Sequence, residues 1–302
     1  MKVLISDKIH QDAIVYLKEK GFAVIYQPDI SAPDLLIQIS RFDCIIVRSR
    51  TRVTKEVIFQ GKNLKLIARA GSGTDNIDLA AAKDRKIAVI NAAGANSQAV
   101  AELTIGLILT LIRNIPYADQ EIKQGKWPKG ELIGSEISNK TVGVIGFGNV
   151  GKKVAALAGA FGAKVLICNS HSEEDQLIKI MKKADFVCLH LSLTDKTRGI
   201  IDKAKISLMK KSAYVINSAR GEIIVEEDLY QALVNRQIAG ASLDVFWQEP
   251  LRESSRWRKL TNVVLTPHIG GSTVESQKKA GMMVAVDLVK FFNREVINSR
   301  VI

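Results

Sequence analysis

Thr141-Val-Gly-Val-Ile-Gly-Phe-Gly-Asn-Val-Gly151 is the segment from which the architecture of this chain can be worked out. Its β-branched first half predicts a buried strand, and residues 152–158 predict a helix. The G-x-G-x-x-G element lies between them. Gly146 permits a tight turn, Gly148 lets a pyrophosphate approach the backbone, and Gly151 lets helix and strand pack closely. The alternative is a glycine-rich turn without a ligand, but the flanking strand and helix favour dinucleotide binding, with the phosphates at the helix N-terminus.

Strand-like runs alternate with helical patterns on both sides of this segment, which predicts parallel sheets. We expect two α/β units, each a doubly wound parallel sheet. A Rossmann-type dinucleotide-binding domain at residues 96–271 is inserted in a flavodoxin-like substrate domain at residues 1–95 and 272–302. The expected strands lie at residues 2–6, 22–26, 43–48, 65–70, 87–91, 141–145, 165–168, 186–190, 214–217, 239–244 and 263–266.

Residues 97–115 form an expected helix that is apolar on almost every side, which predicts burial between domains or between subunits. Residues 116–139 contain scattered glycines and a second proline, and we expect them to be irregular. The apolar character of both segments favours a homodimer, because twofold dimers are the commonest assembly. The last helix, at residues 272–292, is expected to return to the first unit.

Composition excludes several classes of protein. Lysine and arginine number 43 against 31 aspartates and glutamates, but no basic stripe carries interleaved aromatic residues, so no nucleic-acid partner is expected. The positive field suits small anions instead. The three cysteines, Cys44, Cys168 and Cys188, lack metal-ligand spacing, so we expect no metal and a reducing compartment. Without a signal peptide or membrane-spanning run, the expected location is the cytoplasm, with no membrane partner.

Three ionisable residues follow predicted strands, where ligands gather in open parallel sheets. They are Arg220, Glu249 and His268. Each alone has an ordinary explanation as a solvated or loop residue, but together they describe a hydride-transfer site. Histidine exchanges the hydroxyl proton, a carboxylate orients the imidazole, and an arginine fork grips a substrate carboxylate and polarises the adjacent carbonyl. The expected reaction interconverts a small anionic 2-hydroxy acid and its 2-oxo acid.

These segments resemble the D-isomer-specific 2-hydroxyacid dehydrogenase family along nearly the whole chain and in the family's order. The matching stretches are Val47-Arg-Ser-Arg-Thr51, Arg69-Ala-Gly-Ser-Gly-Thr-Asp-Asn-Ile-Asp78, Asn96-Ser-Gln-Ala-Val-Ala-Glu102, the segment quoted first, Leu193-Thr-Asp-Lys-Thr-Arg-Gly199, Asn217-Ser-Ala-Arg-Gly221, Asp244-Val-Phe-Trp-Gln-Glu-Pro250 and Thr266-Pro-His-Ile-Gly-Gly271.

The resemblance implies that Arg220, Glu249 and His268 are catalytic and that the cofactor is NAD. It implies a cofactor site made of Ser72, Gly146, Gly148, Asn149, Val150, Gly151, Asn169, Leu191, Ser218, Ala219, Asp244, Gly270 and Gly271. It also implies substrate contacts from Arg48, Gly71, Ser72, Gly73, Arg220 and His268. Arg50 is either a further phosphate contact or a solvated loop charge.

Asn169 departs from the family pattern, because an acidic residue usually binds the ribose hydroxyls of NAD at this position. Asparagine does not repel a 2′-phosphate, and Ser170 and His171 would accommodate one. The carboxylates of Glu173, Glu174 and Asp175 follow directly and would repel the extra phosphate, so NAD remains the expected cofactor.

Within the family, residues 69–78 and 266–277 are most similar to the members that oxidise D-3-phosphoglycerate to 3-phosphohydroxypyruvate in serine biosynthesis. The chain resembles their short form, without C-terminal regulatory domains. The arginines at positions 48, 50 and 52 favour a phosphorylated acid. Two alternatives stay open. One is a glyoxylate or hydroxypyruvate reductase or another D-2-hydroxyacid dehydrogenase, and the other, more remote, is an NAD-sensing protein related to transcriptional corepressors.

Overall fold

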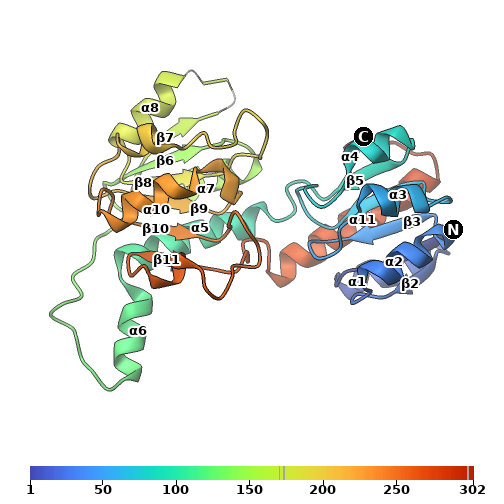
Figure 1. Cartoon of the computed structure of the whole chain (residues 1–302), viewed down its shortest axis with the longest axis horizontal. Coiled ribbons are helices and arrows are strands. Elements are labelled where there is room, and N and C mark those ends of the chain that lie inside the picture. The colour runs from blue at the N-terminus through green and yellow to red at the C-terminus, as the bar shows by residue number, and fades with distance from the viewer. Residues whose placement is uncertain (170, 173, 298) are drawn as a thin grey trace. The chain divides into compact units, whose positions relative to one another are not determined.

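The computed structural model describes residues 1–169, 171–172, 174–297 and 299–302 (Figure 1). The chain folds as two compact units. The first consists of Met1–Asn96 and Gly271–Ile302, and the second of Ser97–Gly270. Each unit contains a sheet in which every strand pairing is parallel. The prediction of two parallel-sheet α/β domains is therefore confirmed.

The first unit is a three-layer sandwich around a sheet in the order β2-β1-β3-β4-β5, the order of flavodoxin. One core cluster lies under α1 and α11, and another lies under α2, α3 and α4 on the opposite face. The elements are β1 (Lys2–Ile5), α1 (Gln11–Glu19), β2 (Ala23–Tyr26), α2 (Ala32–Gln38), a 3₁₀ turn (Ile39–Arg41), β3 (Cys44–Val47), α3 (Lys55–Gln60), β4 (Leu66–Arg69), α4 (Leu79–Asp84), β5 (Ala88–Asn91) and α11 (Val274–Phe292).

Helix α11 completes the first unit although it comes last in the chain. Thr273 caps its N-terminus by accepting a hydrogen bond from Ser276 N. Its buried face, which includes Val284 and Leu288, packs in the same core as Ile14 and Leu17 of α1. Because burying apolar area is the main favourable term in folding, this face fixes the helix against the sheet.

The second unit is built around a sheet in the order β11-β10-β9-β8-β6-β7. Helices α5 and α7 cover one core cluster, and α8, α9 and α10 cover the other. The elements are α5 (Ser97–Ile112), α6 (Ile115–Lys123), β6 (Thr141–Ile145), α7 (Asn149–Ala160), β7 (Lys164–Cys168), α8 (Glu174–Lys183), β8 (Phe186–Leu189), α9 (Lys203–Ile206), β9 (Tyr214–Asn217), a 3₁₀ turn (Gly221–Ile223), α10 (Glu226–Val234), β10 (Gly240–Leu243), a 3₁₀ turn (Arg256–Lys259) and β11 (Val263–Leu265).

Strand β6 is the point at which the connections of the second sheet change direction. Counted from β6, the described strands run 2-1-3-4-5-6, whereas the usual dinucleotide-binding order is 3-2-1-4-5-6. Both orders place the first strand beside a topological switch point, and ligands bind outside the carboxyl ends of the strands there. The glycine-rich segment follows β6 and therefore lies at this position.

Two expectations for residues 97–139 are wrong. The helix expected over residues 97–115 ends at Ile112, because Asn114 takes a left-handed conformation with φ 49°. A second helix, α6, occupies the start of the segment expected to be irregular. Pro116 stands at its first turn, where a missing backbone N–H costs nothing. The buried side chains of α5 pack inside the second unit, against α7 and the sheet.

No single helix within the described ranges is both long and apolar enough to cross a membrane. Helices α5 and α6 meet the length and composition requirement only as a pair, with a bend of 62° between them. Most of α5 is buried in the core of the second unit.

Candidate active site

The turn after β6 requires glycine at two of its positions. Gly146 has φ 97°, and a Cβ there would lie 2.5 Å from the carbonyl oxygen of His190. A Cβ on Gly151 would collide with the carbonyl oxygen of Gly146, so only glycine lets α7 start this close to the strand. A Cβ on Gly148 would meet nothing within 4 Å. The predicted turn and close packing are thus observed, and Asn149 and Val150 stand in the first turn of α7, where backbone N–H groups of a helix have no partner in the helix.

Asn169 follows β7 and uses its side-chain oxygen locally. Its Oδ1 accepts hydrogen bonds from His171 N at 2.8 Å and from Ser172 Oγ at 3.3 Å, while its backbone N donates to Ser172 Oγ at 3.0 Å. The Nδ2 group is what remains for a ribose hydroxyl. Glu174 begins α8, whereas Ser170 and Glu173 lie outside the described residues.

Glu249 and His268 form a hydrogen-bonded pair, with 2.6 Å between Glu249 Oε2 and His268 Nδ1. The other carboxylate oxygen accepts a hydrogen bond from Phe246 N at 3.0 Å. The side chains are 36% and 46% exposed respectively, so solvent and substrate can reach them.

The charge of this pair follows from its surroundings. Partial burial by itself would raise the pKa of Glu249. The hydrogen bonds from His268 and Phe246, together with the electrostatic effect of His268 and Arg220, outweigh burial and lower the pKa of Glu249 below its ordinary value. Glu249 is therefore ionised at neutral pH, and His268 Nδ1 carries the hydrogen that it donates to the carboxylate.

Arg220 is held beside the segment that carries Glu249. Asn217, at the end of β9, donates from Nδ2 to the Arg220 carbonyl at 2.9 Å and accepts from Ala219 N at Oδ1 at 3.1 Å. Gly221 then packs directly on the backbone of residues 246–247, where a Cβ would collide with Phe246. Sequence reasoning did not identify Asn217 as a residue that shapes the site, although an asparagine at a strand end is a familiar signal for a side-chain-stabilised turn.

Asp244 fixes the loop that carries His268. It is fully buried, and its Oδ1 accepts from Thr266 Oγ1 at 2.6 Å and from Ile269 N at 2.9 Å. Its Oδ2 accepts from Gly270 N at 2.8 Å. His268 itself has φ 53°, an uncommon conformation for a residue with a Cβ, which persists only where the surroundings enforce it. All of the observed contacts of this carboxylate are thus with residues 266–270.

The other residues predicted for the cofactor site are divided between the units. In the second unit, Leu191 follows β8, Ser218 Oγ lies 3.2 Å from Thr104 Oγ1, and Ala219 is buried. In the first unit, Ser72 Oγ donates to Asn96 Oδ1 at 2.7 Å, and Gly271 lies close to the same asparagine.

Arg48 and Arg50 have different surroundings in the first unit. The half-buried guanidinium of Arg48 has no hydrogen-bond partner within the described residues, and burial lowers its pKa although Asp7 opposes the change. Arg50 donates to Ser6 O at 2.6 Å and to Ile30 O at 2.9 Å, and it pairs with Asp7 at 3.3 Å. The Arg50 guanidinium is therefore engaged within the protein, while its side chain remains 48% exposed.

Gly71 and Gly73 belong to a loop that Arg69 braces. Arg69 donates from Nη1 to Gly73 O at 2.6 Å and from Nε to Arg48 O at 3.2 Å. The backbone that was predicted to contact substrate in this unit is thus held in one conformation together with Arg48.

Comparison with known proteins adds independent information. Residues 105–270 match the family described as D-isomer specific 2-hydroxyacid dehydrogenase, NAD binding domain. A D-3-phosphoglycerate dehydrogenase of Methanocaldococcus jannaschii is 43% identical over 98% of this chain and 58% of its own length. A hydroxypyruvate reductase of Thermotoga maritima is 40% identical over 96% of this chain and 97% of its own length. The chain thus spans little more than half of the first relative and nearly all of the second.

A solved structure shows the same fold. The NAD⁺-bound 3-phosphoglycerate dehydrogenase of Entamoeba histolytica superposes with a TM-score of 0.85 at 29% identity, covering 100% of this chain and 98% of that one. The prediction of an NAD-binding domain is confirmed by the family match.

Proposed function

Because the chain belongs to the D-isomer-specific 2-hydroxyacid dehydrogenase family, we propose that it transfers a hydride between NAD and D-3-phosphoglycerate, forming 3-phosphohydroxypyruvate. The observation that carries this proposal is the 2.6 Å contact between His268 and Glu249, in the unit that also holds the glycine-rich turn. The bound nicotinamide would accept the hydride from the hydroxyl-bearing carbon, and the reaction would serve serine biosynthesis.

His268 is the proposed base. Ionised Glu249 accepts the Nδ1 hydrogen, so Nε2 carries the lone pair that takes the hydroxyl proton as the hydride leaves the same carbon. The imidazolium that forms is stabilised by the adjacent carboxylate. In the reverse direction His268 returns this proton to the carbonyl oxygen. Protons and electrons balance, because one hydride and one proton leave the alcohol.

Arg220 is proposed to bind the substrate carboxylate and to polarise the oxygen on the neighbouring carbon. Its guanidinium has the planar fork that matches a carboxylate in two places. Asn217 and Gly221 hold its backbone next to residues 246–247, so the fork starts from a fixed position. Fixed donors lower a barrier most because they need no reorganisation during the reaction.

Two observations lead us to propose phosphoglycerate as the substrate rather than an unphosphorylated acid. Arg48 offers a half-buried guanidinium without a partner among the described residues, which is typical of a site for an anion. The D-3-phosphoglycerate dehydrogenases of Methanocaldococcus jannaschii and Archaeoglobus fulgidus are 43% and 40% identical to this chain. The occupation of Arg50 by Asp7 and two carbonyls removes one support that the sequence offered.

Hydroxypyruvate or glyoxylate reduction is the second candidate, because the Thermotoga maritima hydroxypyruvate reductase matches along 97% of its length. Steady-state kcat/KM for 3-phosphohydroxypyruvate, hydroxypyruvate and glyoxylate with NADH decides between them. We expect the phosphorylated acid to be preferred. A larger kcat/KM for either unphosphorylated acid would reject the choice.

The catalytic assignment has its own test. His268→Ala is expected to lower kcat/KM by about 10²–10⁴-fold, the usual contribution of a positioned acid–base group. NADH binding, followed by nucleotide fluorescence, should remain. Retained turnover in His268→Ala would remove the histidine from the mechanism.

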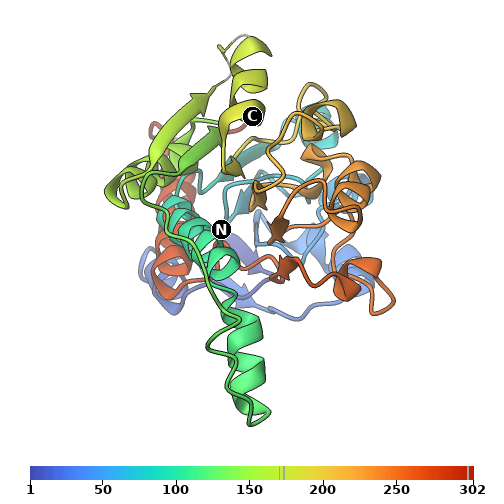
Figure 2. The same ribbon diagram turned by 90° about the vertical axis from the view of Figure 1, so that its left-hand side faces the viewer.

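We also propose a homodimer, with α6 and residues 124–136 as the contact. This arm projects from the rest of the second unit (Figure 2). It exposes Tyr117 by 46%, Trp127 by 80% and Ile133 by 87%. Apolar side chains grouped in this way are typical of an association surface. The thiols of Cys44 and Cys188, buried and unpaired, support a reducing compartment such as the cytoplasm.

A further inference from the structure

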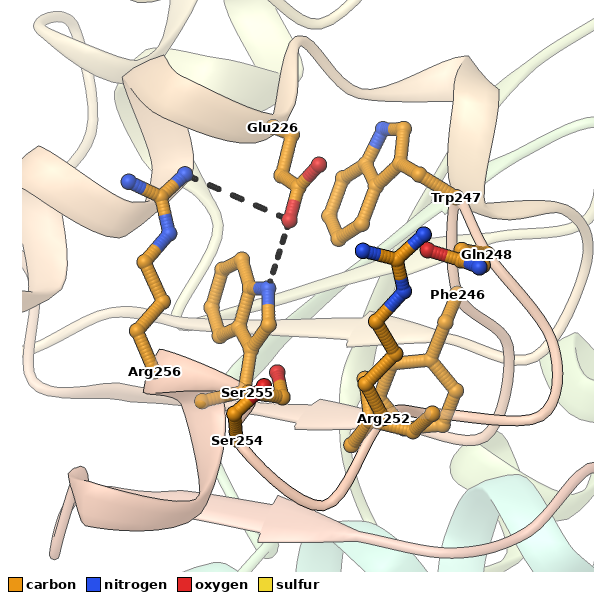
Figure 3. Close-up of a pocket in the computed structure, with 10 residues that line it drawn as sticks. Glu226, Phe246, Trp247, Gln248, Arg252, Ser254, Ser255 and Arg256 are labelled. Carbon is orange, nitrogen blue, oxygen red and sulfur yellow. Dashed lines mark hydrogen bonds and ion pairs between the residues drawn. The ribbon is translucent and has the colours of Figure 1, made fainter.

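A small pocket lies in the second unit next to the segment that carries Glu249, and it is formed by other side chains (Figure 3). Its volume is about 190 Å³. Pockets for drug-sized ligands measure about 300–1,000 Å³, so the occupant must be small. Its walls include Glu226, Trp247, Gln248, Arg252, Arg256 and Trp257. None of these residues belongs to the proposed catalytic or cofactor set.

The acidic side of the pocket is formed by Glu226, which contacts two neighbouring side chains. Glu226 Oε1 accepts a hydrogen bond from Trp257 Nε1 at 2.9 Å and lies 4.0 Å from Arg256 (Figure 3). Arg256 in turn binds Glu227 at 2.6 Å and covers the ring of Tyr230 at 4.0 Å from its centroid. Glu226 Oε1 and the Arg256 guanidinium are therefore already engaged within the protein.

Arg252 is the available charge. Its side chain has no hydrogen-bond or ion-pair partner in the part of the chain that the structure describes, and it extends toward Trp247 and Gln248 (Figure 3). The backbone beside it is held, because Arg258 donates to the carbonyls of Leu251 and Arg252 at 3.2 Å each. A guanidinium fork on a fixed loop suits a carboxylate, which it can bind through two parallel hydrogen bonds.

The aromatic wall selects the rest of the ligand. Trp247 and Trp257 stack at 5.4 Å between centroids with 10° between their planes. Both indole N–H groups are occupied, that of Trp247 by Ile224 O at 2.7 Å and that of Trp257 by Glu226. Trp257 is buried beneath this stack at 1% exposure, so the partly exposed Trp247 is the ring of the pair that a ligand can reach. With its N–H occupied, Trp247 offers an apolar contact rather than a hydrogen bond, and flat rings pack well on such side chains.

We propose that this pocket binds a small aromatic carboxylate, with the carboxylate on Arg252 and the ring against Trp247. Trp247 and Gln248 directly precede Glu249 in the chain, so an occupant that displaces or rigidifies them changes the position of that carboxylate. Binding at this pocket and turnover are then coupled. The binding site stands by itself, whereas the coupling rests on the proposed function of Glu249.

Tryptophan fluorescence reports the pocket directly. The chain has three tryptophans, so Trp127→Phe leaves only the stacked pair. Benzoate added to this variant should give a saturable change in emission. Benzyl alcohol, its uncharged counterpart, and inorganic phosphate, which lacks the ring, should each bind at least tenfold more weakly. A phosphate response equal to that of benzoate overturns the aromatic part of the proposal, and equal binding of benzyl alcohol overturns the role of Arg252.

Substitutions then locate the site. In the Trp127→Phe background, Arg252→Gln should weaken benzoate binding at least tenfold. Arg41→Gln, the same charge change at an exposed arginine of the first unit, should not alter it. Arg220→Gln should also retain the response, since the active site is not the reporter. If Arg252→Gln does not fold, the comparison of benzoate with benzyl alcohol still decides.

The coupling is tested separately, in the full-length protein with an active substrate pair. Benzoate should change kcat without competing with the 2-oxo acid, and Arg252→Gln should abolish this effect. If Arg252→Gln loses benzoate binding but benzoate does not change kcat in the parent protein, the coupling is overturned and the binding site remains. An absence of saturable fluorescence change overturns both.

Discussion

Replacement of Asp244 by asparagine tests whether the buried carboxylate positions His268. The carboxylate accepts three hydrogen bonds, from Thr266 Oγ1, Ile269 N and Gly270 N. An asparagine keeps one acceptor oxygen and places an NH₂ group where the other oxygen was. Whichever way the amide is turned, one backbone N–H of the loop loses its acceptor and faces another donor.

The expected cost follows from those contacts. A hydrogen bond to a charged group contributes about 1.5–3 kcal/mol, and a buried donor left unsatisfied costs about 1–3 kcal/mol. The two figures count partly the same loss and cannot be added in full, so we expect Asp244→Asn to destabilise the second unit by about 2–4 kcal/mol. For a domain of this size each kcal/mol lowers Tm by about 2–4 °C, so the melting temperature should fall by roughly 5–15 °C. The left-handed His268 would also lose its support, and a misplacement near 1 Å costs about 10²-fold in rate.

Calorimetry and steady-state kinetics at neutral pH measure the two effects. Asp202→Asn is the matched control, because Asp202 caps α9 near the surface and asparagine caps a helix equally well. Thr266→Val removes only one of the three hydrogen bonds and should give an intermediate loss of stability. If Asp244→Asn behaves like the control in both Tm and kcat, the carboxylate does not position the loop.

Three further predictions concern the pair, the cofactor and the arm. The pKa of Glu249 is lowered in the folded protein, so its contribution to folding stability is present above the ordinary glutamate pKa of about 4.3 and is lost as pH falls through the folded value. The unfolding free energies of Glu249→Gln and the parent should therefore differ at neutral pH and converge in acid. A difference that does not change with pH would contradict this. Asn169→Asp should raise the preference for NADH over NADPH by at least about tenfold in kcat/KM, since a carboxylate repels the 2′-phosphate; an unchanged ratio would show that position 169 does not contact the ribose. Combined Trp127→Ser and Ile133→Ser substitutions should convert the dimer to a monomer by light scattering, and a monomeric parent protein would disprove the proposed assembly.

Local chemistry explains why most of the fold was predictable. The alternation of short apolar strands with amphipathic helices is a repeated signal, and the glycine spacing at residues 146–151 allows few other backbones. Sequence also placed Glu249 and His268 at strand ends, where they do form a pair. The pairing itself depends on the register of β10 and β11, which no local pattern encodes.

The features that sequence did not predict are those determined by a tertiary contact or by a single backbone dihedral angle. Helix α5 ends because Asn114, a single residue, takes a left-handed conformation. The apolar pattern around it continues, so the pattern alone did not predict the end of the helix. For Arg50, the sequence left a phosphate contact and a solvated charge equally open. Its ion pair with Asp7, which lies far away along the chain, could not be predicted from local sequence. The place of Asp244 in the cofactor site stays a prediction. Its hydrogen bonds to Thr266 and Gly270, in a loop more than twenty positions later, could not be predicted from local sequence.

The contact of Gly221 with the backbone of residues 246–247 has a mechanical consequence. Because no side chain separates the two segments, the turn that carries Arg220 cannot shift without displacing the backbone that leads to Glu249. Under the proposed mechanism, substrate binding by Arg220 and proton transfer at the Glu249–His268 pair therefore both depend on this glycine. Replacement of Gly221, even by alanine, should change both substrate binding and proton transfer in the same variant. Substitutions one position earlier, at Arg220, should change substrate binding and leave the position of Glu249 unaltered.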